Sequence, residues 1–101
     1  MKRKLHKSYH VSKNTNSPKE VLVKLSKSVD WLVRSNVAEN PNTPIEVLIL
    51  LSKDYEDNVC WHVSKNPNTP IETLIELSKH QYYYVSESAK QARINRIGLL
   101  E

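Results

Sequence analysis

The stretch Asn40-Pro41-Asn42-Thr43-Pro44-Ile45-Glu46 decides the fold, because it recurs along the chain at a fixed interval. Asn66-Pro67-Asn68-Thr69-Pro70-Ile71-Glu72 begins 26 residues later, and the related stretch Asn14-Thr15-Asn16-Ser17-Pro18 begins 26 residues earlier (66 − 40 and 40 − 14). Apolar residues keep the same register, with leucine at 22, 48 and 74, leucine at 25, 51 and 77, and valine at 33, 59 and 85. An interval of this length that holds over whole units predicts a tandem-repeat architecture.

Each unit is predicted to begin with a helix at its proline. Ser17, Thr43 and Thr69 are each followed by proline at the first helical position and glutamate at the third, which is the pattern of a capping box. The apolar residues that follow fall at helical spacing. A strand is disfavoured there, because proline cannot donate to a sheet ladder. The asparagine that opens the next unit is expected to end the preceding helix in the left-handed conformation.

A second, shorter helix is predicted in each unit, over residues 30–39, 56–65 and 82–91. Its inward-facing residues are expected to be Val33, Val37, Val59, Val63, Val85 and Ala89. Residues 1–13 are assigned to a basic N-terminal segment with a partial repeat, 14–39, 40–65 and 66–91 to three repeats, and 92–101 to a C-terminal capping helix that extends the last repeat. The predicted fold class is all-α, a single-domain α-solenoid of short helix pairs.

The stretch from Val33 to Leu51, read as Val-Arg-Ser-Asn-Val-Ala-Glu-Asn-Pro-Asn-Thr-Pro-Ile-Glu-Val-Leu-Ile-Leu-Leu, resembles the unit of the variant leucine-rich repeat family position for position. This resemblance covers nearly the whole chain and implies alternating α- and 3₁₀-type helices in a right-handed superhelix. The unit here is slightly longer than the family's usual one, which leaves the second helix either 3₁₀ or fully α. The family's founding protein carries a cysteine cluster for an iron–sulfur centre. Because Cys60 is the sole cysteine, no cofactor is expected here.

The composition excludes several other classes of protein. The only glycine is Gly98, which argues against a hairpin-rich β-protein or a phosphate-cradling loop. A lone cysteine forms no internal disulfide. No apolar run has the length of a membrane span, and none follows the basic N-terminus as a secretory signal requires. These features predict a cytoplasmic protein without a membrane segment.

The histidines and the cysteine do not predict a catalytic or metal site, so no enzyme activity is expected. His6 and His10 stand four residues apart, the spacing that puts two ligands on one helix face, but no third ligand accompanies them. Cys60 and His62 are two residues apart and should point to different sides of a helix. A nucleophilic pair needs hydrogen-bond reach between its members, which this spacing disfavours.

The units differ most on the outward positions of their second helices. These positions lie about 200° around the helix axis from the inward valines, so they should face away from the core. They carry aromatic rings beside acids, and Ser35 and Glu87 share the same column. The competing interpretation is that the rings wedge between adjacent repeats, and at least one of Tyr82, Tyr83 and Tyr84 is expected in the core. Because rings of this kind are enriched in binding hot spots, the sequence predicts a protein-binding face that comprises Trp31, Arg34, Asp57, Trp61 and Tyr83.

The alternative function is nucleic-acid binding by basic residues near the two ends. Residues 1–13 carry five Lys/Arg and no acid, whereas the rest of the chain carries ten against eleven acids, so the N-terminal segment accounts for the net charge of +4. The predicted phosphate contacts are Lys2, Arg3, Lys4, Lys7, Lys90, Arg93 and Arg96. Three repeats are close to the minimum for an independent stack, so homodimerisation through an uncovered repeat end is also expected.

Overall fold

The chain is all-helical over residues 7–98, which are the residues that the computed structural model describes. Within that range it contains no strand, so the predicted all-α class is confirmed. None of its helices is long and apolar enough to cross a membrane. The helices are α1 (Lys7–Lys13), α2 (Lys19–Leu25), α3 (Trp31–Glu39), α4 (Ile45–Leu51), α5 (Asp57–Lys65), α6 (Ile71–Leu77) and α7 (Tyr83–Ile97).

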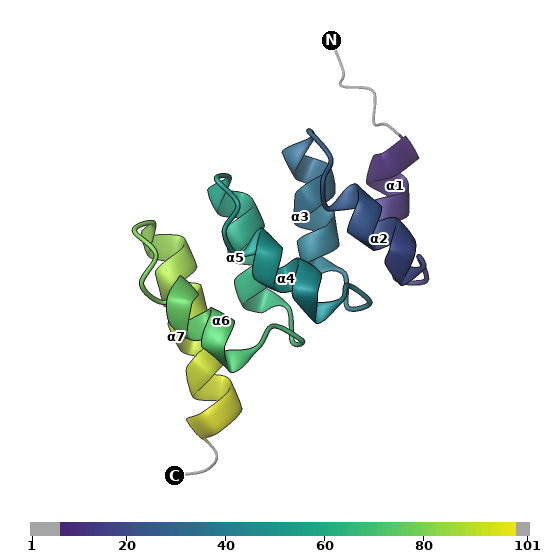
Figure 1. The fold of residues 1–101 in the computed structure, drawn as a ribbon. Helices are drawn as coiled ribbons and strands as arrows, with labels where there is room; N and C mark the ends of the chain where they lie inside the picture. The colour runs from purple at the N-terminus through teal and green to yellow at the C-terminus, as the bar shows by residue number, and fades with distance from the viewer. Residues whose placement is uncertain (1–6, 99–101) are drawn as a thin grey trace.

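The helices alternate between two rows, as Figure 1 shows. In the odd-numbered row, α1 contacts α3, α3 contacts α5, and α5 contacts α7. In the even-numbered row, α2, α4 and α6 each contact the odd-numbered helix before them and the one after them. α3 and α5 thus have neighbours on both flanks and on one face, and α1 and α7 on one flank and one face, which leaves the opposite face of this row open.

The hydrophobic core lies between the two rows. Leu22, Leu48 and Leu74 reach it from the even-numbered helices and are fully buried. Opposite them, every valine or alanine that was predicted to face inward on the odd-numbered helices is buried. Burying one such side chain contributes about 1.5–3 kcal/mol relative to leaving it exposed. The helical spacing of these apolar residues therefore explains why both rows fold against each other.

The predicted capping boxes are wrong, because the hydroxyls act on the preceding helix. Ser17 Oγ donates to the carbonyl of Val11 at 2.7 Å, and Thr43 Oγ1 donates to the carbonyl of Val37 at 2.6 Å. Thr69 repeats this bond to Val63 at 2.7 Å. The last turn of a helix leaves carbonyls without intrahelical partners. The turn between the helices folds each hydroxyl back under one of these carbonyls, and the next helix starts without a side-chain cap.

The boundary asparagines link successive units through a ladder of hydrogen bonds. Asn66 Nδ2 donates to the carbonyls of Ala38 and Asn40 at 2.8 and 3.0 Å, and Asn40 Nδ2 binds the carbonyls of Ser12 and Asn14 in the same way. Asn40 is extended, with φ −69° and ψ 124°, so the left-handed conformation predicted for it is wrong. The extended backbone lets Asn40 Oδ1 accept the N–H of Asn42 while its Nδ2 reaches the preceding unit.

Arg96 takes the place of an asparagine at the end of this ladder. The register puts Ala92 where the next boundary asparagine would stand. Instead, Arg96 Nη2 donates to the carbonyl of Asn66 at 3.0 Å, and Nη1 donates to the carbonyl of Thr69. Because α7 continues unbroken to Ile97, a long side chain from its last turn reaches back to both carbonyls. The guanidinium thus binds one of the two carbonyls of the final rung, that of Asn66, and adds a bond to Thr69.

Candidate functional site

The residues predicted to form a protein-binding face occupy three different environments. Trp31, at the start of α3, is partly exposed. Asp57, in the first turn of α5, lies 3.8 Å from Nε2 of His80 in the loop before α7. Trp61 and Tyr83 stand on neighbouring helices and border the same groove. The structure therefore brings together Trp61 and Tyr83, whereas Trp31 is not among the residues that line the groove.

Arg34 is not on the open face, and its predicted exposure is wrong. Only 6% of Arg34 is exposed. Its Nε and Nη2 donate to the Asp54 carboxylate at 2.8 and 3.2 Å, and its Nη1 donates to the carbonyl of Ser28 at 2.8 Å. The hydrogen bonds that Arg34 donates to Asp54 raise the pKa of Arg34 despite the opposing effect of burial. Ser35 was also expected outside but is buried, because α3 has helices on both of its flanks.

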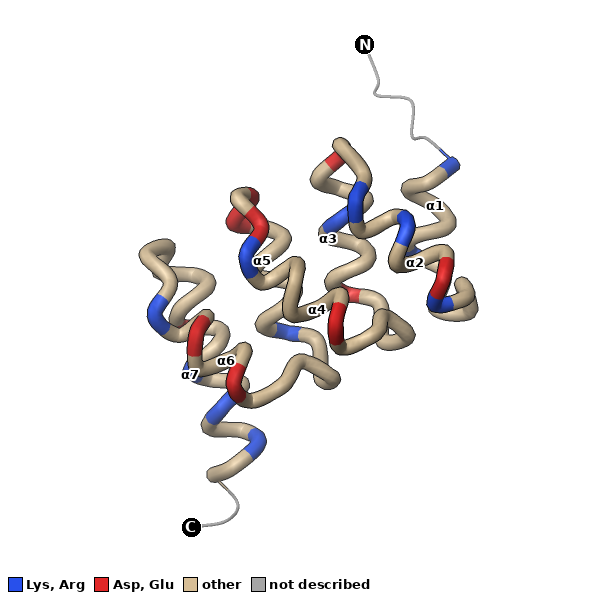
Figure 2. Tube along the Cα trace, in the orientation of Figure 1, with Lys and Arg blue, Asp and Glu red and all other residues tan. Residues whose placement is uncertain are grey.

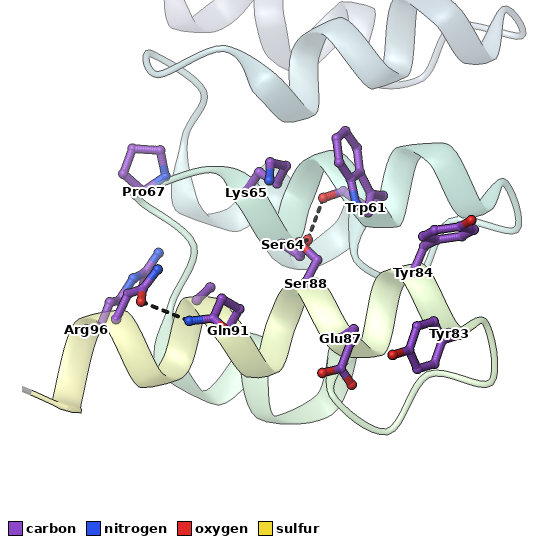
Figure 3. A pocket seen from close by; sticks show the side chains of 12 residues that line it. Trp61, Ser64, Lys65, Pro67, Tyr83, Tyr84, Glu87, Ser88, Gln91 and Arg96 are labelled. Atoms are coloured by element: carbon purple, nitrogen blue, oxygen red, sulfur yellow. Dashed lines mark hydrogen bonds between the residues drawn. The ribbon is translucent and has the colours of Figure 1, made fainter.

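A groove of about 640 Å³ runs between α5 and α7 on the open face of the odd-numbered row. Figure 3 shows its side chains, with the rings of Trp61, Tyr83 and Tyr84 toward one end and Pro67 and Arg96 toward the other. The groove is lined by Trp61, Ser64, Lys65, Pro67, Tyr83, Tyr84, Glu87, Ser88, Gln91, Ala92, Asn95 and Arg96.

Small side chains form the floor of the groove and explain why it lies between these two helices. Ser64 Oγ on α5 donates to Ser88 Oγ on α7 at 2.6 Å. One unit earlier, His62 stands at the position equivalent to Ser88. His62 is half-buried, and the charge of Glu39 on α3 acts on it. Ser88 therefore puts a smaller side chain at this register in the unit that borders the groove.

Aromatic rings form the rim of the groove. Trp61 is partly buried against the hydrophobic core, and the Lys65 ammonium lies 4.9 Å from the centre of its ring. Tyr83 and Tyr84 are 69% and 66% exposed, with ring centres 6.3 Å apart. Tyr82 is exposed as well, so the prediction that one of these three tyrosines enters the core is wrong. Val85, the next residue, supplies the buried position instead.

The thiol of Cys60 and the imidazole of His62, both on α5, have shifted pKa values. Burial, reinforced by the charges of Asp54 and Asp57, raises the pKa of Cys60 from 9.0 to about 11, so the thiol is protonated at neutral pH. Burial also lowers the pKa of His62. Within residues 7–98, no group of three His, Cys, Asp or Glu side chains could hold a metal ion.

The basic residues predicted to contact nucleic acid do not converge on one surface. Lys2, Arg3 and Lys4 lie outside the described residues. Lys7 is exposed on α1, at the opposite end of the row from α7. Figure 2 shows the basic positions of α7 along its C-terminal half. There, Lys90 is exposed, Arg93 lies 3.5 Å from the Ser78 hydroxyl, and Arg96 is bound to backbone carbonyls.

Sequence reasoning missed a second exposed feature, on the even-numbered row. α4 exposes the large apolar side chains of Ile45, Ile49 and Leu50. Its sequence signal was present, because Ile-Glu-Val-Leu-Ile-Leu-Leu has more apolar residues than one buried helix face can take. Tyr84, Lys65 and Gln91 were missed for another reason, since their meeting in the groove depends on how α5 and α7 pack.

The fold and the groove define an all-helical protein with an aromatic-rimmed groove between α5 and α7. None of the family models, curated proteins or solved structures compared with this chain matches it.

Proposed function

We propose that this chain is a non-catalytic helical-repeat scaffold that binds a segment of another protein in the groove between α5 and α7. The scaffold would be a right-handed α-solenoid of the variant leucine-rich repeat kind. Two observations support that architecture: the units recur every 26 residues, and equivalent asparagines bind equivalent carbonyls in the unit before. In a solenoid each unit packs on its neighbours, and its exposed faces are used for binding.

The observation that carries the proposed binding is the position of Trp61, Tyr83 and Tyr84 around a floor of small residues. Large aromatic rings supply much of the binding energy in protein interfaces, especially where they surround a pocket that excludes water. Tyr83 and Tyr84 expose most of their surface, so an occupant of the groove would bury ring area that the folded chain leaves in water. A concave apolar site with a few polar groups is also the common form of a ligand site.

The dimensions of the groove suit a short extended segment. From Tyr84 to Arg96 the groove follows twelve residues of α7, which is about 18 Å at 1.5 Å per residue. An extended chain advances about 3.3 Å per residue, so five or six residues span this length. Along the middle of the groove, Gln91 Nε2 binds Asn95 Oδ1 at 3.2 Å, which leaves one amide oxygen and one amide nitrogen for the main chain of an occupant.

Nucleic-acid binding remains the alternative proposal, and the groove favours it less. Phosphate binding needs several cations whose charges are free to neutralise the backbone. The groove is lined by two cations, Lys65 and Arg96, and Glu87 would face the phosphates from inside it. A protein segment carries fewer charges and makes better use of the rings and amides.

A selection from a random seven-residue peptide library displayed on phage tests the proposal at 0.15 M salt. Selected peptides are then titrated by fluorescence anisotropy against the native chain and against Tyr83→Ser. We expect binding at least about tenfold weaker for Tyr83→Ser, because a hot-spot ring is lost. Asp57 holds the same register as Tyr83, so a polar residue there is compatible with the helix.

Tyr55→Ser is the matched control, because Tyr55 is 85% exposed and lies outside the groove. It should leave peptide affinity unchanged. A library that yields no Tyr83-dependent peptide would overturn the proposal. A single-stranded oligonucleotide that binds through Tyr83, with an affinity that falls steeply between 0.05 and 0.2 M salt, would favour the alternative (about 10³-fold or more for six phosphate contacts).

A further inference from the structure

We infer that the segment bound in the groove is acidic at one end and apolar at the other, with its carboxylates beside Lys65 and Arg96. This inference rests on the proposed function and names the chemistry of the partner. It follows from how charge is distributed along the groove. Arg96 lies at the end away from Tyr83 and Tyr84, and Lys65 lies between Arg96 and these tyrosines, over the Trp61 ring (Figure 3).

Lys65 provides an unpaired positive charge at the end of α5. Its ammonium lies over the Trp61 ring, and no carboxylate within residues 7–98 lies at ion-pair distance from it. The side chain is exposed to solvent, so it can turn toward an occupant without losing a buried contact. A lysine of this kind can pair with a carboxylate while its alkyl stem stays against the ring.

Arg96 provides a second positive charge whose position is fixed. Its guanidinium donates to the carbonyls of Asn66 and Thr69, which are neutral acceptors and leave its charge uncompensated. Because these bonds hold it beside Pro67, the charge does not depend on a flexible side chain finding its partner. A carboxylate bound between Lys65 and Arg96 would meet one mobile cation and one fixed cation.

The single acid that lines the groove is Glu87, and its charge is partly balanced. Glu87 lies one turn from Tyr83, toward the aromatic end, and its carboxylate is 3.9 Å from the Lys90 ammonium. The groove lining therefore carries two cations against one acid, and the cations lie away from that acid. An acidic segment with a ring or aliphatic side chain at its other end matches this arrangement, whereas a basic segment would face Lys65 and Arg96.

Reversing the charge of Lys65 is the direct test. Residues at equivalent positions in other units show which substitution and which control are compatible with the fold. Glu39 stands at the position equivalent to Lys65 on α3, so Lys65→Glu places a residue that the fold already accepts there. Lys13 is equivalent on α1, where its ammonium lies 5.6 Å from the Tyr9 ring, and it does not line the groove between α5 and α7. Lys13→Glu therefore repeats the same change of charge beside a ring, away from the groove.

The peptide selection is run in parallel on the native chain, Lys65→Glu and Lys13→Glu, after circular dichroism has shown equal helix content and similar melting temperatures. Peptides selected on the native chain and on Lys13→Glu should be enriched in Asp and Glu toward one end. On Lys65→Glu this enrichment should disappear or change to Lys and Arg. An acidic peptide from the native selection should bind Lys65→Glu about five- to twentyfold more weakly, because a partly exposed attraction is replaced by a repulsion.

The failure of this inference can be told from the failure of the proposed function. Peptides that need Tyr83 but show no acidic enrichment, or an enrichment that Lys65→Glu leaves unchanged, overturn the inference and keep the groove as a binding site. If no selected peptide depends on Tyr83, both fail. Displacement of the selected peptide by polyuridylate at 0.15 M salt also overturns the inference, because the basic end would then serve phosphates.

Discussion

The guanidinium of Arg96 donates to the main-chain oxygen of Asn66 at 3.0 Å. One unit earlier, the side chain of Asn66 donates to the equivalent main-chain oxygen, that of Asn40. One residue type thus closes a ladder that another residue type builds. The carbonyls at the boundary between units need donors because they lie at helix ends and are shielded from water. The side chains that supply these donors connect the recurring sequence to the stability of the row.

The buried hydrogen bonds of the Asn66 side chain are predicted to contribute more to the free energy of unfolding than the exposed bond of Asn68. Asn66→Ala removes the donor to the carbonyls of Ala38 and Asn40, and should lower the free energy of unfolding by about 2–4 kcal/mol. Asn68→Ala removes one exposed bond to the carbonyl of Pro41 and should cost about 1 kcal/mol or less. Urea unfolding followed by circular dichroism measures both. Equal losses for the two variants would show that the ladder does not hold the units together.

Arg96 is predicted to stabilise the C-terminal end of the row. Arg96→Ala should lower the free energy of unfolding by about 1–3 kcal/mol, because two carbonyls lose their donor. Lys90→Ala, an exposed change on the same helix, should stay within about 0.5 kcal/mol of the native chain. Hydrogen exchange should accelerate at the amides of the last turn of α7 in Arg96→Ala only. Unchanged exchange there would mean that Arg96 is not what anchors this turn.

Replacing one partner of the buried ion pair between Arg34 and Asp54 is predicted to lower the free energy of unfolding more than replacing both partners. Asp54→Ser leaves the Arg34 guanidinium buried without its carboxylate and should lower stability by about 3–5 kcal/mol. In other units, Ser28 occupies the position equivalent to Asp54, and Ser86 the position equivalent to Arg34. The double variant Arg34→Ser with Asp54→Ser therefore introduces residues that the fold already accepts at these positions. The double variant should be more stable than Asp54→Ser alone, as measured by urea unfolding. The reverse order would contradict a role for the uncompensated charge.

Cys60 is predicted to make the fold less stable at high pH. The pKa of Cys60 rises from 9.0 to about 11 on folding, so the folded state keeps its proton over a range in which the unfolded state loses it. The resulting stability is present in full below pH 9 and is lost as the pH rises toward 11, and the difference amounts to about 2–3 kcal/mol. Comparing urea unfolding of the native chain and Cys60→Ser between pH 8 and pH 10.5 isolates this effect. Ser86 holds the equivalent position, so serine fits, and parallel pH profiles would rule the effect out.

The placement of the helices could be predicted from the sequence, because local features set it. Proline and the boundary asparagine fix where helices begin and end, and the spacing of leucines and valines fixes which face is buried. The direction of polar side chains could not be predicted in the same way. Thr43 has the sequence pattern of a cap, but its hydroxyl turns to a carbonyl six residues back once the turn is folded. On α3 considered alone, Arg34 would be open to solvent. In the folded chain it is buried and paired with Asp54, twenty residues away.

The groove was only half predictable for a related reason. Trp61 and Tyr83 stood out as rings on outward positions, and they do border it. The floor of the groove carries a small side chain at Ser88, where the unit before has His62. That difference is visible when the units are aligned by register. Its consequence depends on the packing of α5 against α7, which the sequence pattern does not specify.

The measurement that tests the central claim most directly is a ¹⁵N nuclear magnetic resonance titration of the chain with a selected peptide. The two tryptophans give separate indole signals, and only Trp61 lines the groove. We predict that the Trp61 indole and the amides of Ser88 and Gln91 shift on binding while the Trp31 indole stays in place. Shifts that instead centre on Ile49 and Leu50, on the apolar face of α4, would contradict the account.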